Sequence, residues 1–466
     1  MPPGSGVAWG AWTRTALRVY TSIHMLFSLR LFERPSRAAR AFTRRVPAFA
    51  SCLIAVLVAA RSQAQEPTSA AEGGEPGPSL APVHALPNTL TQLSVMTFGR
   101  GSQVHEYFGH NAFVVSGPGL AAPLVVNYGM FDFGPDMIPQ FLRGRLTFWV
   151  GTAELDATTA SYAAAKRDVR VVDLKLEPAA LQAVLEGIKH DLRPENRRYL
   201  YDHYNDNCST RLRDALDRAL GGQLRRAWAQ PGKYTLREET LRYTQRDPLV
   251  AWSMMFGLGD RVDHRLRQWD EAFLPEELER LLNTTSYQDS HGARVALVSG
   301  RRVLFDAHTE PLAERPDRSW PLLLMLGTSI AIVALALADR VRPGQVNFSR
   351  ICYAALTAAV GISAGLLGSL LLSLWAFSNH VVAHGNENLL LANPLSLIAG
   401  LASLALAATG QVGRLLRALW GTLAFSSVVL LAVHAVSPAF DQDIYWSAAL
   451  LAPINVGFAL ASQRVW

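Results

Sequence analysis

The chain has 466 residues, half of them hydrophobic, and a formal net charge of +6 at neutral pH. Its apolar residues concentrate after residue 318, while its arginines are spread over the N-terminal segment, the middle of the chain and the loops between the apolar runs. A nucleic-acid-binding protein needs a clustered basic face, so this distribution indicates a membrane protein and argues against nucleic acid as a partner. The length allows more than one domain.

Residues 1–64 have the parts of an export signal in the expected order. A basic flank precedes a short apolar core, residues 46–60, and small residues stand at the cleavage positions that end at Ala64. We therefore predict a signal peptide with an N-terminal extension. Residues 65–89 are rich in Pro, Gly, Ser and Glu and are predicted to form a flexible linker.

Residues 90–315 are predicted to form an exported domain of the α+β class. Stretches rich in Val, Phe and Tyr and bounded by Gly or Pro predict strands over 93–99, 111–117, 123–133 and 169–176. The spacing of apolar residues predicts helices over 140–151, 177–193 and 208–220.

Residues 316–466 are predicted to form an all-α membrane domain. Five apolar segments are long enough to span a bilayer: 319–338, 351–377, 393–411, 416–436 and 443–462. Arginines occur in the loops 339–350 and 412–415, whereas the loops 378–392 and 437–442 contain no Lys or Arg. The positive-inside rule then places the Arg-free loops on the exported side, together with the soluble domain. We expect a multi-pass protein of the bacterial inner membrane with its catalytic domain in the periplasm.

The stretch "YNDNCSTR" contains Cys208 at the predicted N-terminus of a helix. Free N–H groups and a partial positive charge at that position lower the pKa of a thiol and can hold an oxyanion. His110, at the start of a predicted strand, is the candidate base. Asn127 on the next strand could orient the imidazole, and Glu106 is an alternative. A Cys, a His and a polar orienting residue form the general thiol triad.

A buried spectator thiol and a metal ligand are the alternatives for Cys208. The predicted soluble domain offers no cysteine to pair with it, because Cys352 lies in a predicted span. His105, His110 and His203 could join Cys208 as metal ligands. These four residues have no CxxC or HxxxH spacing among them, so we predict neither a metal site nor a cofactor.

Five motifs carry a resemblance to a known family. In chain order they are "FGHNAFVV", "NYGMFDF", "FLRGRLTFWVG", "RPENRRYLYDHYNDNCSTRLRDALD" and "FGLGDRVD…FLP". Over residues 90–285 the chain resembles the periplasmic domain of the Lnb-type bacterial lipoprotein N-acyltransferases. Its His-before-Cys order is similar to that of circularly permuted papain-like thiol enzymes. The resemblance implies that Cys208 is the nucleophile and His110 its base, and it leaves the orienting residue open.

The reaction that the resemblance implies is acyl transfer through a thioester. The acyl donor is a phospholipid or a lipoprotein's own diacylglycerol, and the acceptor is the α-amine of an S-diacylglyceryl cysteine on a diacylated lipoprotein. A membrane-tethered cysteine peptidase or amidase of the cell envelope is the alternative, because the same triad hydrolyses a thioester that water can reach. A non-catalytic sensor is a third. Five membrane spans favour a lipid substrate.

Polar residues near these motifs are candidates for substrate binding. Two arginines that we expect to follow a strand near the site could bind a phosphate headgroup. The exported loop 378–394 is polar either for ordinary solvation or because it folds against the soluble domain. The predicted substrate-binding residues are Glu106, Arg143, Arg145, Asn207, Arg211, His380, His384 and Asn388.

Overall fold

The computed structural model of the protein describes residues 86–131, 137–315, 320–342, 345–409 and 413–465. The predicted signal peptide and residues 65–85 of the predicted linker lie outside this part of the chain. The described residues form a mixed α+β sheet domain followed by five long apolar helices, which confirms the predicted fold class.

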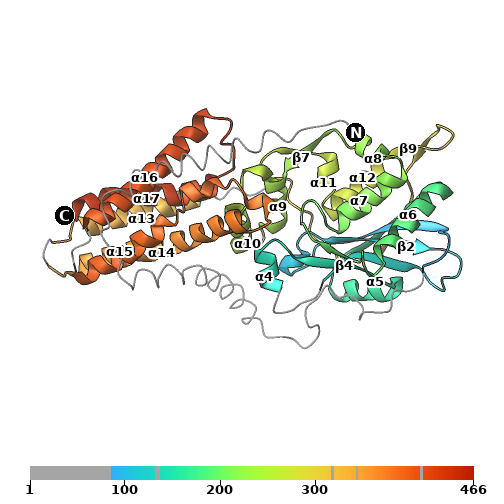
Figure 1. Ribbon diagram of the computed structural model, residues 1–466, viewed down its shortest axis with the longest axis horizontal. Helices are drawn as coiled ribbons and strands as arrows, with labels where there is room; N and C mark the ends of the chain where they lie inside the picture. Colours follow the sequence, from blue (N-terminus) through green and yellow to red (C-terminus); the bar gives the residue numbers. More distant parts are fainter. Residues whose placement is uncertain (1–85, 132–136, 316–319, 343–344, 410–412, 466) are drawn as a thin grey trace. The chain divides into compact units, whose positions relative to one another are not determined.

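The sheet domain is built on a seven-stranded sheet with the order β11-β5-β1-β2-β3-β4-β6, in which all neighbours are antiparallel (Figure 1). Its strands are β1 (Gln92–Phe98), β2 (His110–Ser116), β3 (Leu124–Met130), β4 (Thr147–Glu154), β5 (Val169–Leu174), β6 (Arg198–Leu200) and β11 (Val298–Phe305). β1, β2, β3 and β5 confirm the four predicted strands, whose β-branched and aromatic residues suit a pleated, buried surface.

The predicted helix over 140–151 is wrong in its second half. The segment divides into the short helix α4 (Met137–Leu142) and the strand β4, with Gly144 between them at a φ of +64°. A positive φ is easily adopted only by glycine and ends the helix. "TFWV" then pairs with β3, and this pairing outweighs the helical spacing of its apolar residues.

Helices cover both faces of the sheet (Figure 1). α6 (Pro178–Asp191), α7 (Cys208–Ala219), α8 (Gln223–Ala227) and α12 (Pro275–Thr284) share one core with strand residues such as Val95, Phe113 and Val126. α5 (Leu155–Ala164) shares the opposite core with their sequence neighbours, including Met96, Ala112 and Val125. Successive strand residues therefore point to opposite faces, and both faces are buried.

The rest of the sheet domain consists of short elements that follow α8 or connect the strands. Two small hairpins pair β7 (Pro231–Thr235) with β8 (Arg265–Arg267) and β9 (Ser286–Gln288) with β10 (Arg294–Ala296). The remaining helices are η1 (Val104–Glu106), α9 (Leu236–Thr244), α10 (Pro248–Gly257), η2 (Asp260–Val262) and α11 (Gln268–Glu271). α9, α10 and the end of α11 enclose a separate apolar cluster around Tyr204, Met255 and Phe273.

The membrane domain contains five helices that are long and apolar enough to cross a bilayer, as predicted. Four of them are α13 (Trp320–Ala338), α14 (Phe348–Phe377), α16 (Gly413–Val436) and α17 (Tyr445–Arg464). The third span in chain order, Glu387–Ala407, consists of a 3-10 turn and most of α15 (Leu395–Thr409). Two 3-10 turns, η3 (Val381–Ala383) and η4 (Glu387–Leu390), lie between α14 and α15. Gly361 and Gly365 of α14 contact the main chain of α15, a close approach that small residues permit.

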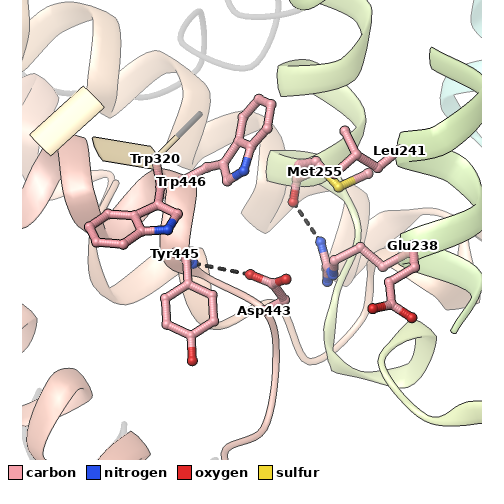
Figure 2. A pocket seen from close by; sticks show the side chains of 8 residues that line it. Glu238, Leu241, Met255, Trp320, Asp443, Tyr445 and Trp446 are labelled. Atoms are coloured by element: carbon pink, nitrogen blue, oxygen red, sulfur yellow. Dashed lines mark hydrogen bonds between the residues drawn. The ribbon is translucent and has the colours of Figure 1, made fainter. Parts of the chain in front are cut away.

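α13 and α17 run in the same direction. The first residues of both helices, Trp320 and Tyr445, line one pocket (Figure 2), and Arg464 at the end of α17 pairs at 2.9 Å with Asp339, the residue after α13. Five successive spans reverse direction at each of their four connections, and the parallel α13 and α17 agree with this.

Candidate active site

Cys208 is the first residue of α7, and its position is set by the N-cap residue Asn207. The Asn207 Oδ1 atom accepts from the N–H of Thr210 at 2.9 Å, and the Thr210 hydroxyl accepts from the N–H of Asn207 at 2.8 Å. This reciprocal cap stabilises the first turn of the helix. The predicted location of the thiol at a helix N-terminus is therefore confirmed.

Asn207 has all of its side-chain polar atoms engaged inside the protein. Its Nδ2 atom donates to the main-chain carbonyls of His203 at 2.7 Å and Phe273 at 3.0 Å, and the residue is buried. These bonds join the cysteine loop to the end of α11. Through these bonds Asn207 positions Cys208. The prediction for Asn207 was a contact with substrate.

His110 and Asn127 are hydrogen-bonded, with 2.8 Å between Nε2 and Oδ1. The same Oδ1 atom accepts from the N–H of Gly129 at 2.7 Å, which identifies it as the amide oxygen. An amide oxygen can only accept, so His110 Nε2 must carry a proton. In the neutral ring, Nδ1 is then the basic nitrogen. Asn127, and not Glu106, is the residue that orients the imidazole.

The His110 ring is held between neighbouring groups of β1 and β3. Phe98 stacks on it with ring centroids 5.6 Å apart. Gly129 lies so close that an added Cβ would come within 2.4 Å of Cε1 of the ring. A side chain at residue 129 must therefore displace the imidazole, which explains the glycine in "NYGM".

The Cys208 thiol has a lowered pKa despite its burial. Burial raises the pKa, but the charge of His110 and hydrogen bonds from His110, the Asn111 N–H and the Ser209 hydroxyl together outweigh it. The thiol therefore ionises more readily than an ordinary cysteine, in a buried site that also contains a base. An activated nucleophile needs a thiol of lowered pKa beside a base, and this site contains both.

Alkylation of Cys208 by iodoacetamide should reach half its maximal rate at a pH below the usual thiol pKa of about 8.5. His110→Ala should move this midpoint upward, because burial then dominates the pKa of the thiol. Mass spectrometry of the Cys208 peptide over a pH series measures the effect without interference from Cys352. Identical pH profiles for the two proteins contradict the assigned coupling.

Ser209 and Asn111 connect the cysteine helix to the histidine strand and were not predicted. The Ser209 hydroxyl donates at 2.8 Å to Asn111 Oδ1, and Asn111 Nδ2 donates at 3.0 Å to Thr97 Oγ1. Ser209 and Asn111 are fully buried. The only sequence signal was their position directly after Cys208 and His110. Their bond sets the distance between the two elements that carry the reactive groups.

Glu106 and Arg211, two predicted substrate-binding residues, are engaged by other side chains. Glu106 is buried, pairs with the buried Arg167 at 3.2 Å and accepts from the N–H of Gln103 at 3.0 Å. Arg211 donates to both carboxylate oxygens of Asp206 at 2.6 and 2.8 Å, and its guanidinium lies over the ring of Tyr199. The structure gives both residues structural partners because each charge needs one when it is partly or fully buried.

The predicted exported loop folds against the sheet domain. Asn386 and Asn388 donate to the Phe256 carbonyl at 2.9 and 3.0 Å, and the Gly259 N–H donates to the Val382 carbonyl at 2.7 Å. Asn388 is fully buried and is part of this contact.

The other predicted polar residues lie at the start of that loop or against it. Arg143 and Arg145 are exposed and follow α4, so the prediction that they follow a strand is wrong. His380 Nε2 contacts the Phe141 carbonyl, and His384 Nε2 lies 3.3 Å from the Ser378 carbonyl. None of these contacts involves Cys208 or His110.

A small pocket lies where α9 and α10 meet the starts of α13 and α17 (Figure 2). Its apolar wall includes Trp320, Tyr445 and Trp446, aromatic residues that typically sit at a membrane–water interface. Arg237 lines its other side, and neither Cys208 nor His110 is among the lining residues. Within the described ranges, no three His, Cys, Asp or Glu side chains are grouped so as to hold a metal ion.

Comparison with known proteins gives two matches that together span both domains. Residues 86–242 match the family model described as the Lnb N-terminal periplasmic domain, and residues 321–453 match the one described as the Lnb transmembrane domain. No curated protein and no solved structure matches the chain. The first match includes Cys208, His110 and Asn127.

Proposed function

Because the chain belongs to the Lnb family, we propose that it is an apolipoprotein N-acyltransferase of the bacterial inner membrane. The proposed donor is a phospholipid or the diacylglycerol of a lipoprotein, and the proposed acceptor is a diacylated lipoprotein. The observation that carries the proposal is a thiol of lowered pKa beside the His110–Asn127 pair, in a chain with five candidate membrane spans.

The first half-reaction forms the acyl-enzyme. His110 Nδ1 takes the proton of the Cys208 thiol, and the sulfur attacks the ester carbonyl carbon of the donor. A C–S bond forms while the carbonyl becomes an oxyanion. We assign the N–H groups of Cys208 and Ser209, the first two donors of α7, to that oxyanion. When the intermediate collapses, the bond to the glycerol oxygen breaks and His110 gives that oxygen a proton. A thioester and a deacylated donor result.

The second half-reaction transfers the acyl chain to nitrogen. The α-amine of the lipoprotein's N-terminal cysteine attacks the thioester carbonyl, and His110 Nδ1 takes a proton from that amine. The C–S bond then breaks and Cys208 leaves as the thiolate, which its surroundings stabilise. The product is an amide-linked third acyl chain. Anchoring of the enzyme and both substrates in one membrane raises their effective concentration.

The test uses the full chain in lipid nanodiscs that contain a phospholipid donor and a synthetic diacylated lipopeptide. We expect mass spectrometry to find the lipopeptide heavier by one fatty acyl chain, located on its α-amine. Release of free fatty acid or cleavage of a peptide bond, with the lipopeptide amine unmodified, overturns the transferase and supports the envelope hydrolase.

A further inference from the structure

We propose that α4 and the turn after α14 form one membrane-inserted surface that binds the outer leaflet of the bilayer. This interfacial surface consists of Ile138 and Phe141 on α4, and Phe377 and Val381 at the end of α14 and in the following turn. The inference concerns the contact of the sheet domain with lipid and does not depend on the acyl-transfer reaction.

α4 gains little from packing in the sheet domain. None of its six residues is buried, and its two large apolar side chains, Ile138 and Phe141, are 40% and 56% exposed. A single-turn helix is not stable by its own hydrogen bonds. Neighbouring exposed apolar side chains of this size usually mark a surface that another apolar phase covers.

The end of α4 is attached to the residues that directly follow α14. The Asn379 N–H donates at 2.9 Å to the Arg143 carbonyl, and His380 Nε2 contacts the Phe141 carbonyl. Gly144 fits against the main chain here, because an added Cβ would lie 2.9 Å from the Asn379 carbonyl carbon. These contacts hold the end of α4 against the residues that directly follow the last turn of α14.

The length of α14 sets the depth of this contact. Its 30 residues correspond to about 45 Å of helix, which matches a bilayer including its headgroup regions. Phe377, its last residue, is therefore at headgroup level and is 83% exposed. Since α4 is bonded to the turn after Phe377, Phe141 lies at the same level, where an aromatic side chain is favourable.

The charges beside α4 suit a phospholipid. Arg143 and Arg145 follow α4 and are exposed, and neither has an acidic partner among the described residues. Arginines at headgroup depth bind lipid phosphates through charge-assisted hydrogen bonds. The combination of exposed apolar side chains, flanking arginines and direct continuity with a membrane span identifies the occupant as bilayer phospholipid, and not as a lipoprotein polypeptide.

The test replaces Phe141 with photo-activatable benzoylphenylalanine in the full chain, in its own membrane. Val303 on β11 provides the matched control, because it is also an apolar side chain and is 57% exposed, against 56% for Phe141. After irradiation, we expect phospholipid adducts at position 141 at several times the yield found at position 303. The same result is expected with the probe at position 138.

Equal yields at positions 141 and 303 overturn the proposal, as do adducts at 141 that consist only of polypeptide. The measurement is repeated with Cys208→Ala in the same chain. Lipid capture should be unchanged by that substitution, so failure of the interfacial surface and failure of the proposed acyltransferase give distinguishable results.

Discussion

Replacement of Cys208 by Ala is expected to lower N-acylation of the lipopeptide to less than about one-thousandth of the wild-type rate, because no thioester can form. Intact-protein mass spectrometry should find an acyl adduct on the wild-type chain, located on the Cys208 peptide, and none on the variant. An acyl group found at another residue contradicts the assignment of the nucleophile.

Replacement of His110 or Asn127, the two other members of the site, should lower the acylation activity to different extents. His110→Ala removes the base and raises the pKa of the thiol, so we expect a loss of at least about a hundredfold. Asn127→Ala leaves the base in place but removes the acceptor that fixes its tautomer, so the loss should be smaller. The exposed His291 in the β9–β10 hairpin provides a control, and His291→Ala should retain activity. Full activity of His110→Ala contradicts the mechanism.

Replacement of Arg237 by Ala is expected to destabilise the sheet domain by about 3–5 kcal/mol. Arg237 is almost fully buried in α9 and pairs with Asp263 at 2.7 Å. It also donates to the carbonyls of Met255, Leu258 and Gly259 at 2.7 to 3.0 Å. Its removal leaves the buried Asp263 carboxylate and the carbonyls of Met255 and Gly259 without this donor. The melting temperature of the full chain in detergent measures the effect.

Two further variants separate the effect of the buried Arg237 charge on stability from the effect of losing the packing of its side chain. Arg267→Ala removes an exposed arginine of β8 and should leave the melting temperature nearly unchanged. Addition of Asp263→Ala to Arg237→Ala should restore part of the lost stability, because the uncompensated charge disappears with the carboxylate. If Arg237→Ala melts like the wild-type protein, the bonds of this guanidinium contribute no net stability.

Patterns within short stretches were sufficient to predict the five spans, four strands of the seven-stranded sheet and the helix that begins at Cys208. Each depends on the spacing of apolar residues or on a cap a few residues away, so neighbouring positions contain the information. The segment 140–151 was mispredicted because the spacing of its apolar residues fits both the 3.6-residue period of a helix and the two-residue period of a strand. Pairing with β3 decided between them.

The polar residues of the site needed the tertiary structure. Glu106, Asn207, Arg211 and Asn388 were predicted to contact substrate, yet their side chains bond to groups within the protein. For Asn388 the partner is 132 residues away in the chain, and no local pattern contains such a contact.

The candidate triad was likewise predictable in part from the sequence, while the rest followed only from the tertiary structure. The residue types and their order along the chain pointed to Cys208 and His110, because a thiolate and a base are recognisable one residue at a time. The tautomer of His110 followed only from the fold, where β3 brings the Asn127 oxygen between the Gly129 N–H and the imidazole. The Ser209–Asn111 bond likewise joins residues 98 positions apart. Hydrogen bonds depend on distance and direction in space, which only the packed chain determines.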